Sequence, residues 1–206
     1  MAAPPTRPVL RDRYDRRRQA VVQQAARVFA ERGYDQTSIQ DLAEAIGLAA
    51  GGIYHYIGSK EQLLIRICDQ LMDPLLDRAR EVAASDADPE AQLRAIVRLW
   101  VAQVVEHRDH MLVFQQERHV IESGDQWRGV RSGRKQFERV VAGVLDRVLA
   151  DGRLRLGDRR LALSALLGMV NHTAQWFGPR GRLQVDQVAD GYVELLLLGD
   201  DERPRG

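Results

Sequence analysis

Apolar residues recur at intervals of three and four along most of this chain, and glycine, proline and short polar runs separate the apolar stretches. This spacing is typical of α-helices with one buried face, and the alternation expected of strands is nearly absent. The pattern therefore predicts an all-α protein of about nine helices. The expected helices cover residues 12–32, 37 to the turn at 47, 50–56, 59–84, a stretch from 89, 108–122, 126–150, 158–177 and 185–198.

The ends of several expected helices carry capping residues. The segments Thr37–Gln40 and Ser59–Gln62 each have the spacing of a capping box, in which two side chains satisfy free backbone amides. Asp88 is placed as an N-cap before Pro89, which suits the first position of a helix. Pro74 lies inside an expected helix, where it removes a backbone donor, so we expect a kink or a break there.

The segment Thr37–Leu63 is the most informative part of the chain. It contains two short helices joined at Gly47 by a tight turn, followed by a longer helix. This layout fits a helix-turn-helix, whose second helix enters the major groove of DNA. On that helix, the hydroxyls of Tyr54 and Tyr56 can donate to phosphate, and His55 can reach a base edge.

Composition limits the classes of protein that this chain can belong to. It has 206 residues, of which 45% are hydrophobic, so it can bury a sizeable core. The net charge is only +1, but the first eighteen residues are basic: Arg7, Arg11, Arg13, Arg16, Arg17 and Arg18 are opposed only by Asp12 and Asp15. A basic arm can bind phosphate, although residues 1–8 also fit a solvated leader.

Cysteine content and hydropathy indicate a cytoplasmic protein. Cys68 is the single cysteine, so the chain has no intramolecular disulfide, which suits a reducing compartment. No apolar run approaches the roughly 20 residues of a membrane span, and the first residues lack the apolar core of a secretory signal. We therefore expect no membrane partner.

The region from about Arg17 to Leu64 resembles the DNA-binding domain of the tetracycline-repressor (TetR) family of transcriptional regulators. The resemblance is carried in register by Phe29, Gly33, Thr37, Ala43, Gly47, Gly51, Tyr54, Ser59, Lys60, Glu61 and Leu63. A generic three-helix unit, with Tyr54 as an ordinary half-buried aromatic residue, is the alternative. The resemblance implies a flexible basic arm at 1–11, a helix-turn-helix head at 12–58, a larger helical ligand-binding and dimerisation domain at 59–199, and a mobile tail at 200–206.

The resemblance also implies roles for individual residues in binding a double-stranded DNA operator. The predicted DNA-binding residues are Arg17, Thr37, Ser38, Tyr54, Tyr56 and Lys60 at phosphates, and Gly51, Gly52 and His55 over the bases. The sequence departs from the family at Ala49, where serine or threonine is usual, at Gly52, often threonine, and at Ile57, usually phenylalanine. The first two departures remove polar groups, so base readout would depend on His55, backbone approach and DNA shape.

Family members usually bind a small effector in the helical domain. The predicted ligand-binding residues are Trp100, Gln103, Val104, Met111, Phe114, Gln115, Arg118, Arg134, Phe137, Met169, His172 and Trp176. Plain core packing is the alternative for the apolar members. The segment Trp176–Leu183 resembles acyl-coenzyme A-responsive members, which govern fatty-acid, steroid or aromatic-acid catabolism. A hydrophobic drug-like ligand of efflux or stress regulators is the alternative effector.

The last two expected helices carry more apolar residues than one core contact needs. The predicted homodimer interface contains Leu163, Leu166, Leu167, Val170, Ala174, Val188, Tyr192, Leu195 and Leu196, because related regulators dimerise through these helices as a four-helix bundle. A helix-turn-helix dimer reads two half-sites related by twofold symmetry.

An enzyme is the main alternative class. His107, His110 and His119 with Glu117 are candidate metal ligands, but their spacing does not place all three histidines on one helix face, so solvent-facing or capping roles fit better. The chain has no glycine-rich phosphate loop and no nucleophile elbow. The sequence thus predicts a ligand-responsive repressor that is not an enzyme and needs no metal or cofactor besides the effector, with an activator as the open alternative.

Overall fold

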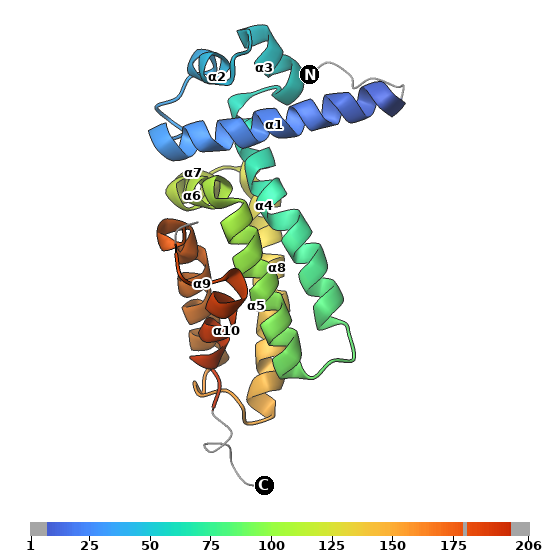
Figure 1. The fold of residues 1–206 in the computed structure, drawn as a ribbon, viewed down its shortest axis with the longest axis vertical. Helices are drawn as coiled ribbons and strands as arrows, with labels where there is room; N and C mark the ends of the chain where they lie inside the picture. Colours follow the sequence, from blue (N-terminus) through green and yellow to red (C-terminus); the bar gives the residue numbers. More distant parts are fainter. Residues whose placement is uncertain (1–7, 179–180, 199–206) are drawn as a thin grey trace. The chain divides into compact units, whose positions relative to one another are not determined.

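The computed structural model describes residues 8–178 and 181–198 (Figure 1). Within these ranges the chain forms ten α-helices, one short 3-10 helix and no extended β-strand, which confirms the predicted all-α class. The helices are α1 (Pro8–Arg32), α2 (Ile39–Ile46), α3 (Ala50–Ile57), α4 (Lys60–Ala83), α5 (Pro89–Glu106), α6 (Arg108–Gln116), α7 (Arg118–Glu122), η1 (Asp125–Trp127), α8 (Arg128–Ala150), α9 (Arg159–Trp176) and α10 (Val185–Glu194).

The predicted caps hold at two helices and shift at a third. Asp88 accepts a hydrogen bond from the backbone of Glu90 ahead of α5, and Ser59 and Gln62 form the expected reciprocal pair ahead of α4. The cap of α2 is Ser38 rather than Thr37, and its box partner is Asp41 rather than Gln40. The prediction was wrong by one residue because Thr37 turns inward and is buried.

Two other expected helices differ from the prediction in their bounds. Helix α1 begins at Pro8 instead of about residue 12, so residues 8–11 of the expected arm are helical, with a proline at a position that tolerates it. The expected helix 108–122 is interrupted at Glu117, which separates α6 from α7. Helix α4 continues without a break through Pro74, so a kink there stays a prediction. The remaining expected arm, residues 1–7, and the tail, 200–206, lie outside the described residues.

Helix α10 ends at Glu194 because the next residues pair with a loop instead of extending the helix. Arg155 donates its backbone N–H to Leu196 O (2.8 Å), and Leu198 donates its own to Arg153 O (2.8 Å). The result is an isolated antiparallel bridge between Leu154 and Leu197, both buried. This pairing joins segments more than forty residues apart, so helical periodicity alone did not predict it.

The chain divides into two compact units. The first contains Met1–Gln70 and Asp109–Val130, and the second contains Leu71–Arg108 and Arg131–Gly206. In the first unit, α2 and α3 lie above α1 in Figure 1, and α6 and α7 lie below it. One hydrophobic core runs through this unit and includes Phe29, Leu42, Ile53, Leu63 and Trp127.

The second unit has its own core. Helix α10 packs against α5 and α9, and α5 also contacts α9. Trp100 and Phe137 meet edge to face, with ring centroids 4.8 Å apart, and both side chains are buried. Bidentate hydrogen bonds from Arg98 to Asp190, both at 2.8 Å, join α5 to α10. Among the described residues, no helix combines the length and the hydropathy that crossing a membrane requires.

We predict that the Arg98–Asp190 ion pair makes part of the stability depend on pH. The Arg98 guanidinium lowers the pKa of the Asp190 carboxyl by hydrogen bonding. The stabilisation is therefore present above the unfolded carboxyl pKa of about 3.9 and is lost as the pH falls through the folded pKa. Asp190→Asn should lower the urea midpoint at pH 6, and this difference from the parent should shrink below pH 4. An equal difference at pH 2.5 and pH 6, or the same effect of Asp190→Asn in an Arg98→Gln background, would contradict the prediction.

Candidate nucleic-acid interface

The geometry of α2 and α3 is set by local interactions and by burial. Gly47 ends α2 with a left-handed backbone (φ 70°), a conformation that glycine adopts without strain. Leu42 on α2, and Ile53 and Ile57 on α3, are buried in the core of the first unit. The predicted arrangement of two short helices across a glycine turn is therefore confirmed, and the opposite side of α3 is left for other contacts.

Helix α3 exposes a surface free of large side chains at its start. A Cβ atom added at Gly51 would meet nothing within 4 Å, and one added at Gly52 would meet only side-chain atoms of Leu48, the nearer at 3.7 Å. Packing within the protein therefore does not require glycine at either position. Two glycines nevertheless weaken a helix by roughly 1 kcal/mol each relative to alanine. The open surface is thus a property of α3 that the fold itself does not need.

The three aromatic residues that follow are arranged by a contact that sequence reasoning missed. Tyr54 is 50% exposed and His55 is exposed, whereas Tyr56 is half-buried. Tyr14 of α1 donates its hydroxyl to the His55 backbone oxygen (3.2 Å), and its ring lies 5.2 Å from the ring of Tyr56. Tyr14 therefore holds α3 against α1. The only sequence signal for this role is that Tyr14 lies on the buried face of the first helix.

The predicted hydroxyl donors at the start of α2 are already used inside the protein. Thr37 is 1% exposed and donates its hydroxyl to Gly33 O (2.7 Å). The hydroxyl of exposed Ser38 donates to the Asp41 carboxylate (2.6 Å), and the Ser38 hydrogen bonds lower the pKa of Asp41. Thr37 thus stabilises the α1–α2 loop and Ser38 caps α2, and their contacts with phosphate stay predictions.

Lys60 begins α4 and lies over the ring of Tyr34, with its ammonium 4.2 Å from the ring centroid. Burial, together with the nearby carboxylate of Glu61, raises the pKa of Tyr34 to about 12, so the phenol stays neutral at physiological pH. A lysine in the first turn opposes the helix dipole unless an anion approaches the same end. The position of Lys60 is therefore suited to an anion, and its contact with phosphate stays a prediction.

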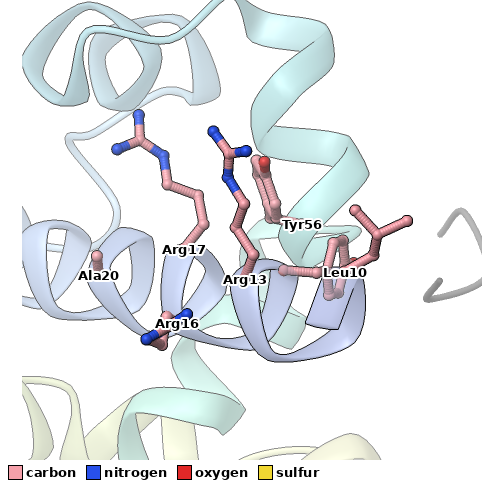
Figure 2. Close-up of a pocket in the computed structure, with 7 residues that line it drawn as sticks. Leu10, Arg13, Arg16, Arg17, Ala20 and Tyr56 are labelled. Atoms are coloured by element: carbon pink, nitrogen blue, oxygen red, sulfur yellow. The ribbon is translucent and has the colours of Figure 1, made fainter. Parts of the chain in front are cut away.

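Arg17 is exposed and borders an open hollow of about 830 Å³ between α1 and α3. The residues that line it are Leu10, Arg13, Tyr14, Arg16, Arg17, Ala20 and Tyr56 (Figure 2). The close-up shows the guanidinium groups of Arg13 and Arg17 extending from α1 on the side that faces Tyr56. The hollow thus brings together two predicted phosphate-binding residues, Arg17 and Tyr56, and adds Arg13.

Glu117 has a role that the sequence analysis did not predict. Its side chain is buried at the junction of α6 and α7 and accepts a hydrogen bond from the backbone N–H of Tyr34 (3.0 Å). Next to it, Gln116 donates to Ala30 O (3.3 Å) at the end of α1. Glu117 is therefore an internal cap of the α1–α2 loop, a long-range role that no local motif reveals.

The candidate metal ligands do not form a metal site in the described residues. No group of three histidine, cysteine or acidic side chains there has the geometry to hold a metal ion. His107 caps the end of α5 and His119 is exposed, in line with the expected capping and solvent-facing roles. His110 is buried and lies 3.1 Å from the Gln70 side-chain oxygen, so the expectation of a solvent-facing or capping role was wrong for this residue.

The predicted ligand-binding residues fall into both units. In the second unit, Trp100, Val104 and Phe137 are buried, Gln103 donates to Leu71 O (3.1 Å), Met169 is half-buried, Arg134 lies 3.5 Å from Glu138, and His172 and Trp176 are exposed. In the first unit, Met111 is buried, Phe114 packs against the core, Gln115 is half-buried, and exposed Arg118 lies 4.0 Å from Glu122. Trp100 and Phe137 are in direct contact, and the ligand site stays a prediction.

The predicted dimer residues also divide into two sets. Leu166, Val170, Ala174, Val188 and Leu196 are buried within the chain itself, so they pack its own core. Leu163 and Leu167 are half-buried, and Leu195 is 65% exposed. Tyr192 is half-buried with its hydroxyl 2.9 Å from that of Thr173. Only this second set has surface left for a partner, and the dimer stays a prediction.

A helix-turn-helix beside cationic side chains, joined to a larger helical unit, defines a DNA-binding transcriptional regulator. Residues 21–67 match the family described as bacterial regulatory proteins, tetR family, and residues 86–199 match the tetracyclin repressor-like C-terminal domain. The chain therefore belongs to the tetR family of bacterial regulatory proteins, and it is a transcriptional repressor of that family.

Relatives and solved structures agree with this assignment. The HTH-type transcriptional repressor KstR2 of Rhodococcus jostii (strain RHA1) is 30% identical over 184 residues, which cover 89% of this chain and 90% of the relative. The structure of the ketosteroid transcriptional regulator KstR2 of Mycobacterium tuberculosis has a TM-score of 0.79 and 26% identity, covering 87% and 92% of the two chains. AibR in complex with isovaleryl coenzyme A and operator DNA has a TM-score of 0.74 and 30% identity, covering 87% and 97%.

We predict that removal of the Glu117 carboxylate destabilises the α1–α2 loop. Glu117→Ala leaves the backbone N–H of Tyr34 without its acceptor, which should cost about 1–3 kcal/mol of unfolding free energy. Glu117→Gln keeps an acceptor oxygen of the same size and should cost clearly less. Chemical denaturation, with amide hydrogen exchange at Tyr34, measures both effects. Equal losses in the two variants would show that the hydrogen bond is not the stabilising contact.

Proposed function

We propose that this repressor binds a palindromic DNA operator as a homodimer and that an acyl-coenzyme A thioester releases it. The open surface at the start of α3 carries the DNA-binding part of the proposal, because internal packing does not require the glycines there. Backbone could approach the groove floor at Gly51 and Gly52, with exposed His55 reaching a base edge. Tyr54, Tyr56, Arg17 and Lys60 would hold the flanking phosphates.

The way helix-turn-helix proteins read DNA supports the proposed homodimer. Two recognition helices roughly 34–36 Å apart reach successive major grooves on one face of the duplex. Large apolar side chains remain exposed in and next to α9 and α10: Leu161 at 56%, Trp176 at 48%, Leu183 at 50% and Leu195 at 65%. Large exposed apolar side chains of this kind can mark an interaction site. A second copy of the chain would cover these residues, and its α3 would read the other half-site.

The effector proposal rests on similarity that extends through the second unit. AibR, 30% identical over 87% of this chain, was solved with isovaleryl coenzyme A bound. The edge-to-face pair of Trp100 and Phe137 supplies apolar surface of the kind that an acyl group needs. The coenzyme phosphates would need cations, since charged groups are not buried without partners. The protein would act in the cytoplasm by binding rather than by catalysis.

Lys60→Ala should weaken binding to operator and random DNA alike, because a phosphate contact carries no sequence information. The slope of log K against log salt should fall by about 0.9, the value for one neutralised phosphate. Lys135, the only other lysine, lies in α8 of the second unit, so Lys135→Ala is a matched control of the same charge change. Equal slopes for parent and Lys60→Ala over a salt titration would remove Lys60 from the contacts.

A mobility-shift panel tests the effector class. Isovaleryl, benzoyl, long-chain and steroid-acid thioesters of coenzyme A are compared with their free acids and with coenzyme A alone. At least one thioester should release the operator at concentrations where its free acid does not, since the free acid lacks the phosphate contacts. A complete switch requires a preference for the released state of roughly 5.5 kcal/mol. Release by free acids or drug-like compounds, with no thioester active, would refute the thioester proposal and leave the repressor assignment intact.

A further inference from the structure

The first helix carries an arginine pair whose charges the described fold leaves uncompensated. Arg13 and Arg17 are four residues apart, and Figure 2 shows both guanidinium groups extending into the hollow beside Tyr56. Like charges at this spacing repel each other and destabilise a helix. Nearby Arg18 has a carboxylate partner, Asp15, at 3.7 Å, but within residues 8–178 and 181–198 neither Arg13 nor Arg17 forms an ion pair. The two guanidinium groups are therefore suited to bind an anion that is not part of the protein.

The position of this pair relative to the recognition helix is fixed. Tyr14 lies between the two arginines in sequence and is buried against α3. Its hydroxyl donates to the backbone oxygen of His55, and its ring contacts the rings of His55 and Tyr56, with centroids 5.5 and 5.2 Å away. The arginine pair and α3 thus belong to one packed arrangement, and DNA that meets α3 also meets the hollow.

From this geometry we propose that Arg13 and Arg17 together bind a single backbone phosphate of DNA, next to the recognition helix, with Tyr14 as the residue that positions them. The proposal rests on the proposed operator binding and adds a specific anion site to it. Guanidinium groups suit this role because their planar donors match phosphate oxygens. The hollow is wide and open, which suits a phosphate on a large polymer rather than an enclosed small molecule.

The neighbouring residues explain why these two arginines are singled out. Leu10 and Ala20 border the same hollow and offer no charge, and Arg16 is the third arginine that lines it. Arg13 and Arg17 extend from the same side of α1, so both can reach one phosphate group. Arg16 extends from the opposite side of α1 in Figure 2, away from Tyr56. It therefore provides a comparison on the same helix, since Arg16→Ala removes the same charge at the border of the hollow but on the side away from Tyr56 and the proposed phosphate.

The salt dependence of DNA binding tests the proposal. Arg13→Ala and Arg17→Ala should each weaken binding to operator and random DNA by similar factors. The double variant should lower the slope of log K against log salt by about 0.9 in total, because the two arginines neutralise one phosphate, and not by about 1.8 as for two separate phosphates. Arg16→Ala should leave the slope unchanged. Arg13→Lys should keep a slope close to that of the parent but weaken the affinity, because lysine keeps the charge but loses the planar donor pair.

Each other outcome has a defined meaning. A double variant with the parental slope, or with a loss near 1.8, refutes the shared phosphate. An equal loss in Arg16→Ala shows a general charge effect and also refutes it. Free coenzyme A in a binding assay distinguishes the other source of phosphate: loss of its binding in the double variant, with unchanged DNA slope, assigns the hollow to the effector instead. If the parent protein binds no DNA, the proposed operator binding fails first. Matching thermal unfolding of all variants confirms that they fold.

Discussion

The recognition helix depends on burial because it cannot be stable alone. Helix α3 has eight residues, fewer than the roughly 12–15 at which isolated helices become even marginally stable. It carries two adjacent glycines, and its N-cap residue Ala49 makes no side-chain cap. Ile53 and Ile57, both essentially inaccessible, must therefore supply the stabilisation by packing into the core of the first unit. The surface proposed to meet DNA has its shape because the other side of α3 is buried.

This dependence makes the first unit a continuous packed body. Tyr14 joins α3 to the beginning of α1, and Gln116 and Glu117 join the end of α1 and the following loop to the α6–α7 junction. Tyr34 lies at the centre, with its backbone N–H bound by Glu117 and its ring under Lys60. A displacement of Glu117 at the α6–α7 junction would therefore move Tyr34, and with it Lys60, which is predicted to bind phosphate. All of these interactions lie within the first unit.

Much of this architecture follows from local rules that can be read in sequence. Helical periodicity, the Asp88 cap, the Ser59 capping box and the turn at Gly47 each depend on a few neighbouring residues, and all appear in the structure. The choice of Ser38 over Thr37 as a cap was missed, because both residues can cap a helix and tertiary burial decides between them.

The features that escaped prediction are contacts between distant segments. The bond from Tyr14 to His55 spans 41 residues, and the one from Tyr34 to Glu117 spans 83. Neither hydrogen bond is marked by a local sequence pattern. A glutamate in a helical stretch is normally predicted to lie on the surface, so its burial cannot be predicted before its partner is known. The break between α6 and α7 belongs to the same class, since it occurs where Glu117 turns toward the loop.

The free space beside Gly51 and Gly52 affects how the DNA sequence preference of such a repressor could change in evolution. Because an added Cβ meets at most the Leu48 side chain at ordinary van der Waals distance, either glycine could be replaced by a small residue with no steric penalty and a gain in helix propensity. The two positions are also those proposed to face the bases. After gene duplication, a copy could therefore acquire a different binding site while its scaffold stayed intact, and selection on the scaffold would not oppose the change.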